Sequence, residues 1–135
     1  MNQAVIGIGS NIDPVENTAE AITALAEGQR LLARSRFVWT KPIGPPQPAY
    51  LNGAVLIETP LDRDALKAWL RGVEDRLGRV RSAERFGPRT IDLDVVVWNG
   101  QVVDEDVRTR AFLRQAVSEV WPPARSAAAC AAGAP

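Results

Sequence analysis

The sequence predicts one α+β domain with an antiparallel sheet. Its periodic segments follow the order strand, helix, strand, strand, helix, strand, which is the order of the ferredoxin-like fold with helices on one face of the sheet. An extra helical segment follows, ending at Pro122-Pro123. At 135 residues the chain has the usual size of a domain with one core. We expect the domain to span residues 1–122 and residues 123–135 to form a disordered tail.

The first half of the chain supplies a strand, a helix and a second strand. The apolar run 4–9 predicts a short strand. The pair Asp13-Pro14 is typical of a helix start, and Gly28 is typical of a helix end. Residues 31–39 alternate loosely between polar and apolar, so a second strand is expected there. The proline-rich segment 41–48 that follows can be neither helix nor central strand.

The second half repeats this pattern and adds the extra helix. A strand is expected at 50–58, a helix from Asp62 or Asp64 to Gly78, a strand at 90–98 turned by Asn99-Gly100, and a last helix at 107–120. One residue of the 50–58 strand is unusual. Asn52 lies on a face that is otherwise apolar or aromatic, which marks it as a candidate ligand-contacting residue.

Composition narrows the class of protein. Sixteen basic and sixteen acidic residues give a formal charge of zero, which argues against a role in non-specific binding to nucleic acids or anionic membranes. The absence of histidine removes the usual general base and the commonest zinc ligand. A single cysteine allows no disulfide within the chain, and no apolar run approaches the roughly 20 residues of a membrane helix. We therefore expect a soluble, cytoplasmic protein.

Asp92 and Asp94 are the strongest chemical signal. On a strand they share one face and lie roughly 6.5–7 Å apart, at about 3.3 Å of rise per residue. Like charges at this spacing are destabilising without a partner, and Mg²⁺ is a natural partner for carboxylates. A solvated strand face that happens to carry two acids is the alternative, and the spacing alone would favour it. The apolar residues that follow indicate a central strand, which favours the metal site.

Arginines cluster directly before this acid pair. Residues 71–89 contain six arginines and three acids. Four of them lie between the expected helix and the acid strand, where they could meet the phosphate that a metal ion brings: Arg79, Arg81, Arg85 and Arg89. A solvated helix end and loop is the alternative explanation for these charges.

Four further side chains could form one flat pocket. Thr40 and Asn52 offer hydrogen-bonding groups to the edge of a heterocycle, and Tyr50 and Phe112 offer rings to its faces. Taken singly, each of these residues is more typical of a structural role.

Together these motifs resemble the 6-hydroxymethyl-7,8-dihydropterin pyrophosphokinase family of folate biosynthesis. The resemblance covers nearly all of the chain before residue 123, and the run Gly87-Pro88-Arg89-Thr90-Ile91-Asp92-Leu93-Asp94 is its most specific part. The other matching segments are Gly9-Ser10-Asn11, 40–44, 47–52, Glu74 with 78–81, Arg110-Ala111-Phe112 and 119–122.

The resemblance implies transfer of pyrophosphate from ATP to the pterin hydroxymethyl group, with release of AMP. Two Mg²⁺ ions would be held by Asp92 and Asp94. The implied catalytic residues are Arg79, Arg89, Asp92 and Asp94; the ATP contacts are Glu74, Arg79, Arg81, Arg89 and Arg110; and the pterin contacts are Thr40, Ile43, Tyr50, Asn52 and Phe112. We expect a monomer that binds ATP and a pterin, with no nucleic-acid or membrane partner.

One segment departs from the family pattern. Relatives usually carry a Pro-His segment that touches the ATP phosphates, whereas here Asp104-Glu105-Asp106 leads almost directly to Arg110. We therefore expect activity to be reduced, and a catalytically impaired or repurposed pterin-binding paralogue is the main alternative. An RNA-binding module on the same scaffold is a second alternative, although the acids of the central strand argue against it.

Overall fold

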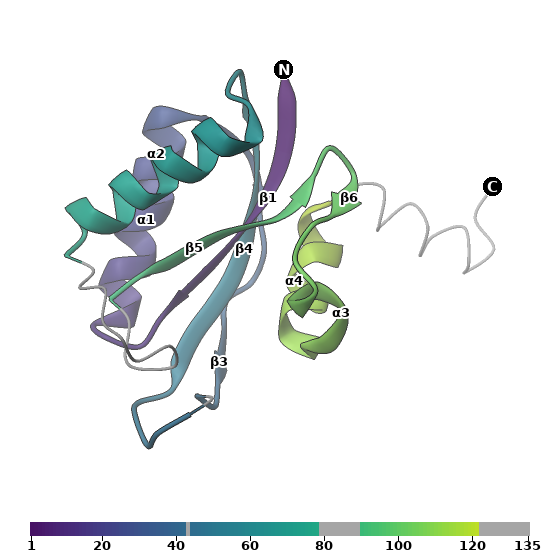
Figure 1. Cartoon of the computed structure of the whole chain (residues 1–135). Coiled ribbons are helices and arrows are strands. Elements are labelled where there is room, and N and C mark those ends of the chain that lie inside the picture. The colour runs from purple at the N-terminus through teal and green to yellow at the C-terminus, as the bar shows by residue number, and fades with distance from the viewer. Residues whose placement is uncertain (43, 79–89, 122–135) are drawn as a thin grey trace.

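The computed structural model describes residues 1–42, 44–78 and 90–121 of the chain (Figure 1). The elements are β1 (Asn2–Ser10), α1 (Pro14–Gly28), β2 (Arg30–Arg34), β3 (Val38–Thr40), β4 (Tyr50–Thr59), α2 (Arg63–Arg76), β5 (Asp92–Trp98), β6 (Gln101–Val102), α3 (Asp106–Thr109) and α4 (Ala111–Val120). The expected tail lies outside the described residues.

All strands belong to one antiparallel sheet. The strand order is β2-β4-β1-β5-β6, and β3 pairs with β4 beside β2. Strand β1 is therefore central, with β4 on one side and β5 on the other. This arrangement confirms the predicted α+β, ferredoxin-like fold.

Helices cover both faces of the sheet (Figure 1). Helices α1 and α2 pack on the face formed by alternate residues such as Ile6 and Val55. Helix α4 packs on the opposite face, where Val5 and Leu56 are also buried. The expectation of helices on one face holds for α1 and α2 only. Strand β1 buries apolar side chains on both faces, so the second face also needs a covering element.

Two predicted elements are divided in the structure. The expected strand 31–39 is interrupted after Arg34, because Ser35 replaces regular pairing with a backbone and a side-chain hydrogen bond to Ala54, both 2.9 Å long. The Phe37 ring then packs where a side chain at Gly53 would stand, 2.5 Å from the position of its Cβ. The expected helix 107–120 is interrupted at Arg110, whose extended backbone (φ −111°, ψ 114°) separates α3 from α4.

The helix starts were predicted with mixed success. Asp62 caps α2, because its side chain accepts a 2.8 Å hydrogen bond from the Ala65 amide. Asp13 is the residue before α1, as expected, but its side chain makes no cap hydrogen bond. Its backbone is left-handed (φ 42°), whereas a capping side chain normally works from an extended backbone. No helix among the described residues has the length and apolar character to cross a membrane.

Candidate active site

One cavity of 1010 Å³ brings the predicted site residues together. It lies over β1 and β5, and α2, α3 and α4 contribute side chains to its lining. Eight predicted residues line it: Thr40, Tyr50, Asn52, Glu74, Asp92, Asp94, Arg110 and Phe112. The predicted residues Ile43, Arg79, Arg81 and Arg89, together with Arg85, lie outside the described part of the chain.

The acid pair lies on β5 beside two glycines of β1. Asp92 pairs in register with Gly9, and Asp94 pairs with Gly7. The aspartates alternate with Leu93, which is buried in the core on the face of α1 and α2. Both carboxylates therefore belong to the α4 face, as the strand period predicted. Neighbouring glycines add no side chain to this part of the cavity floor.

The surroundings of Asp94 disfavour its ionised form. Burial within the cavity, followed by the negative charge of Asp92, raises the pKa of Asp94 from 3.8 to about 8. A hydrogen bond to Asp92 and the charges of Glu74 and Asp104 act in the same direction. The Asp94 side chain is still reached by solvent in the cavity. A bound cation would remove most of this repulsion.

The donor set fits Mg²⁺ that arrives with a nucleotide. Among the described residues, no group of three or more His, Cys, Asp or Glu side chains could hold a metal ion by itself. Mg²⁺ is commonly bound by one or two carboxylates, with phosphate and water oxygens completing its shell. Two aspartates on one strand face match that requirement.

Glu74 lies on the cavity wall but is almost fully buried. It is 3% exposed, and its Oε2 accepts a 2.8 Å hydrogen bond from the Leu93 amide. The sequence placed Glu74 among the ATP contacts. The structure shows its carboxylate joined to the backbone between Asp92 and Asp94, and its contact with ATP stays a prediction.

The predicted pterin residues form a polar and aromatic group at the other end of the cavity. The Asn52 side-chain amide donates to the Thr40 hydroxyl. Asn52 lies directly on β1, since a Cβ at Gly9 would be 2.6 Å from its Oδ1. Tyr50 shares the Asn52 face of β4, and Phe112 enters the cavity from α4. The unusual polar residue of the 50–58 strand thus lines the cavity.

The motif Gly9-Ser10-Asn11 connects the elements around this site. The buried Ser10 hydroxyl donates to the Thr90 carbonyl, just before β5. The Asn11 side chain donates to Gln47 Oε1 and to the Pro48 carbonyl, at 2.8 and 3.0 Å. The expected strand-to-helix turn therefore also anchors the proline-rich loop that leads into Tyr50.

Three basic residues of α2 line the cavity and were not predicted. Arg63, Lys67 and Arg71 are spaced four residues apart, so they form one row along the helix. The row lines the same cavity as β5, whose outer side pairs with β6 at Val97 and Trp98 among the described residues. Arg63 Nε is buried and has no hydrogen-bond partner among the described residues. The four-residue spacing was the signal that could have revealed this row.

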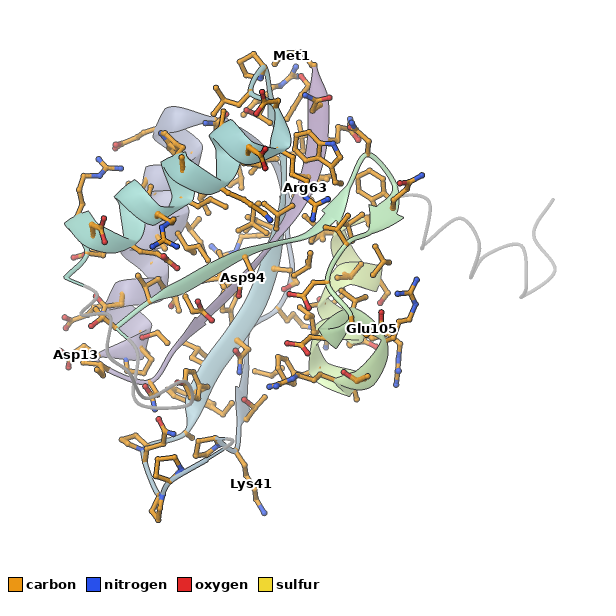
Figure 2. All side chains as sticks on the ribbon, in the orientation of Figure 1. Met1, Asp13, Lys41, Arg63, Asp94 and Glu105 are labelled. Atoms are coloured by element: carbon orange, nitrogen blue, oxygen red, sulfur yellow. The ribbon has the colours of Figure 1, made fainter. Side chains whose placement is uncertain are left out.

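The three acids Asp104, Glu105 and Asp106 also line the cavity. Figure 2 labels Glu105, just before α3, with Asp94 on β5 and Arg63 on α2. Glu105 pairs with Arg108 at 2.9 Å, and Asp106 pairs with Arg110 at 3.6 Å. Asp104 accepts a 3.0 Å hydrogen bond from the Asp106 amide. Arginines of the same segment therefore offset two of the three negative charges.

The fold and this cavity define a ferredoxin-like domain that places an acid pair, a basic helix row and a polar, aromatic slot around one small-molecule site. Residues 5–122 match the family model described as 7,8-dihydro-6-hydroxymethylpterin-pyrophosphokinase (HPPK). The chain belongs to this family.

Bacterial relatives agree with the family match. A protein of Pseudomonas putida is 40% identical over 106 residues, covering 76% of this chain and 88% of its own. A protein of Methylorubrum extorquens is 41% identical over 134 residues, covering 90% and 84%. A protein of Synechocystis is 33% identical over 130 residues, covering 88% and 66%. All three are named 2-amino-4-hydroxy-6-hydroxymethyldihydropteridine pyrophosphokinase.

Proposed function

We propose that this protein transfers pyrophosphate from ATP to the hydroxymethyl group of 6-hydroxymethyl-7,8-dihydropterin in folate biosynthesis, releasing AMP. Membership of the pyrophosphokinase family supports the reaction class. The observation that carries the proposal is that the acid pair and the pterin slot open into one cavity. One site can therefore hold both substrates at once, as a direct transfer requires.

The pterin end would orient the acceptor. Asn52 and Thr40 are already joined by a hydrogen bond. Their remaining donor and acceptor groups would therefore be oriented toward the cavity before a ligand arrives. Tyr50 and Phe112 would stack on the ring faces, at the low entropic cost of rigid aromatic side chains. The hydroxymethyl group would then point toward β5.

The acid pair would hold two Mg²⁺ ions together with the ATP phosphates. Bound Mg²⁺ supplies charge neutralisation to the triphosphate and to the developing alkoxide. The carboxylates of Asp92 and Asp94 lie on one strand face, and the raised pKa of Asp94 suits a group that a cation would neutralise. No histidine base is needed, because reactions of this kind depend mainly on positioning and charge neutralisation.

The basic side chains would hold the nucleotide. We assign Arg110 and the α2 row of Arg63, Lys67 and Arg71 to the nucleotide side of the cavity, because they line it beside β5. Arg63 is half-buried and lines the cavity, so its guanidinium would be a charged group for the phosphates. The family motif supports phosphate contacts for Arg79, Arg81 and Arg89. It also supports catalytic roles for Arg79 and Arg89.

The proposal is tested by measuring AMP release with both substrates and Mg²⁺. We expect turnover that requires ATP and the hydroxymethyl pterin and stops when EDTA removes the metal. The acids at 104–106 favour one alternative, the impaired paralogue. Clear pterin binding without AMP release would support it. We also propose a cytoplasmic monomer, because ATP is the co-substrate and a single cysteine suits a reducing compartment.

A further inference from the structure

Glu74 makes a buried contact with the strand that carries the acid pair. The Leu93 amide donates to its Oε2 at 2.8 Å, and Leu93 is the residue between Asp92 and Asp94. A carboxylate that is 3% exposed is costly unless it is hydrogen-bonded, so this contact ties α2 to β5 at Leu93.

Among the described residues, no strand pairs with the outer side of β5 at the same point. Leu93 pairs with Ile8 of β1 on its inner side. On the outer side, β6 reaches only Val97 and Trp98 among the described residues. An outward-facing amide of an edge strand normally meets water or another chain. Here the Glu74 carboxylate takes the place of the missing strand.

We propose that Glu74 is a positioning residue that holds Asp92 and Asp94 in place through the Leu93 amide, rather than a contact of the nucleotide. The inference rests on the proposed function, since it assumes that the acid pair binds Mg²⁺. Side chains two residues apart on a strand move with the backbone that joins them. Losing a group that orients metal ligands typically costs 10–100-fold in metal affinity or activity.

The test compares Glu74→Ala and Glu74→Gln with the wild-type protein. Mg²⁺ binding is measured by calorimetry with a non-hydrolysable ATP analogue, and binding of the analogue alone is measured in EDTA. We expect Glu74→Ala to weaken Mg²⁺ binding by about tenfold or more while leaving analogue binding in EDTA unchanged. Glu74→Gln keeps an acceptor for Leu93 and should stay within about threefold of wild type. Asp64→Asn, an exposed acid of the same helix, is the control.

Two results would overturn the inference while leaving the proposed function intact. One is unchanged Mg²⁺ binding in Glu74→Ala with weaker analogue binding in EDTA, since that assigns Glu74 to the nucleotide. The other is a loss in Glu74→Gln as large as in Glu74→Ala, since charge would then matter and the hydrogen bond would not. A wild-type protein that binds no Mg²⁺ would overturn the metal site itself, and this inference with it.

Amide hydrogen exchange at Leu93 keeps the test decisive if Glu74→Ala does not fold. Glu74→Gln should retain a protected Leu93 amide together with near wild-type Mg²⁺ affinity. A protected amide combined with lost Mg²⁺ affinity would contradict the positioning role.

Discussion

Neutralising Asp94 should make the metal-free protein more stable while destroying its metal site. In the folded protein the pKa of Asp94 is raised from 3.8 to about 8, first by burial and then by the charge of Asp92. The folded state therefore resists ionisation of this carboxyl, and the unfolded chain does not. The stability associated with Asp94 is fully present below pH 3.8 and is lost as the pH rises toward 8.

The size of the effect follows from the same shift. One pKa unit corresponds to about 1.4 kcal/mol of free energy. Because the Asp94 side chain is reached by solvent, water screens its repulsion and only part of the shift should count toward stability. We expect Asp94→Asn to add about 1–2 kcal/mol at pH 8, or roughly 3–8 °C in Tm for a domain of this size. The replacing amide can still donate a hydrogen bond to Asp92.

The assay is thermal unfolding in EDTA at pH 8 and at pH 4.5. The gain of Asp94→Asn over wild type should be largest at pH 8 and should shrink at pH 4.5, where the wild-type carboxyl is also neutral. Glu20→Gln, which removes an exposed carboxyl of α1 outside the cavity, should show no such gain. Adding Mg²⁺ with an ATP analogue should stabilise the wild type and not Asp94→Asn. A variant no more stable than wild type at pH 8 would refute the electrostatic argument.

Three further predictions test other parts of the molecule. Tyr50→Ala should weaken pterin binding by about tenfold through lost stacking. Trp39→Ala is the control, because this ring is 58% exposed and lies outside the cavity, and it should not change pterin binding. Equal pterin affinities of the two variants would remove Tyr50 from the slot. Lys67→Ala should raise the KM for ATP by about threefold or more relative to Arg76→Ala, and equal KM values would exclude the α2 row from the nucleotide site. Glu119 accepts hydrogen bonds from the backbone and side chain of Arg36, and chiefly the backbone bond lowers the pKa of its carboxyl below 4.5. Glu119→Gln should therefore cost about 0.5–1 kcal/mol at pH 7, with the difference vanishing as the pH falls below 4.5; a difference independent of pH in unfolding experiments would contradict this.

The sheet and the acid pair could be predicted because both depend on a strict local period. Residues of the 50–58 segment alternate between the two cores, as expected, so Asn52 was correctly placed on a cavity-facing side. The same rule correctly placed Asp92 and Asp94 on one face of their strand. Such predictions need only the two-residue repeat of a strand, which tertiary contacts rarely override.

The departures arise where a side chain replaces a regular backbone contact. The Ser35 hydroxyl accepts a hydrogen bond from the Ala54 amide, and this contact interrupts the second strand. The alternation of polar and apolar residues does not reveal such a contact. The extended backbone at Arg110 and the left-handed backbone at Asp13 are two further local departures from the expected helices. The basic row of α2 was missed for another reason. Charges on a helix surface are usually solvated. This row lines a cavity because α2 lies beside β5 in the folded protein.

The charges around the cavity indicate how a pyrophosphokinase site without histidine could hold a nucleotide. Among the described residues that line it, six carboxyl groups face five basic side chains. That balance would be poor for a bare triphosphate, which carries several negative charges. It would suit a triphosphate that arrives with the proposed Mg²⁺ ions, because the metals would bind the acids and offset the phosphate charges. Mg²⁺ concentration, more than ATP concentration, should therefore limit the activity of this family member, and a Mg²⁺ titration at saturating ATP measures it directly.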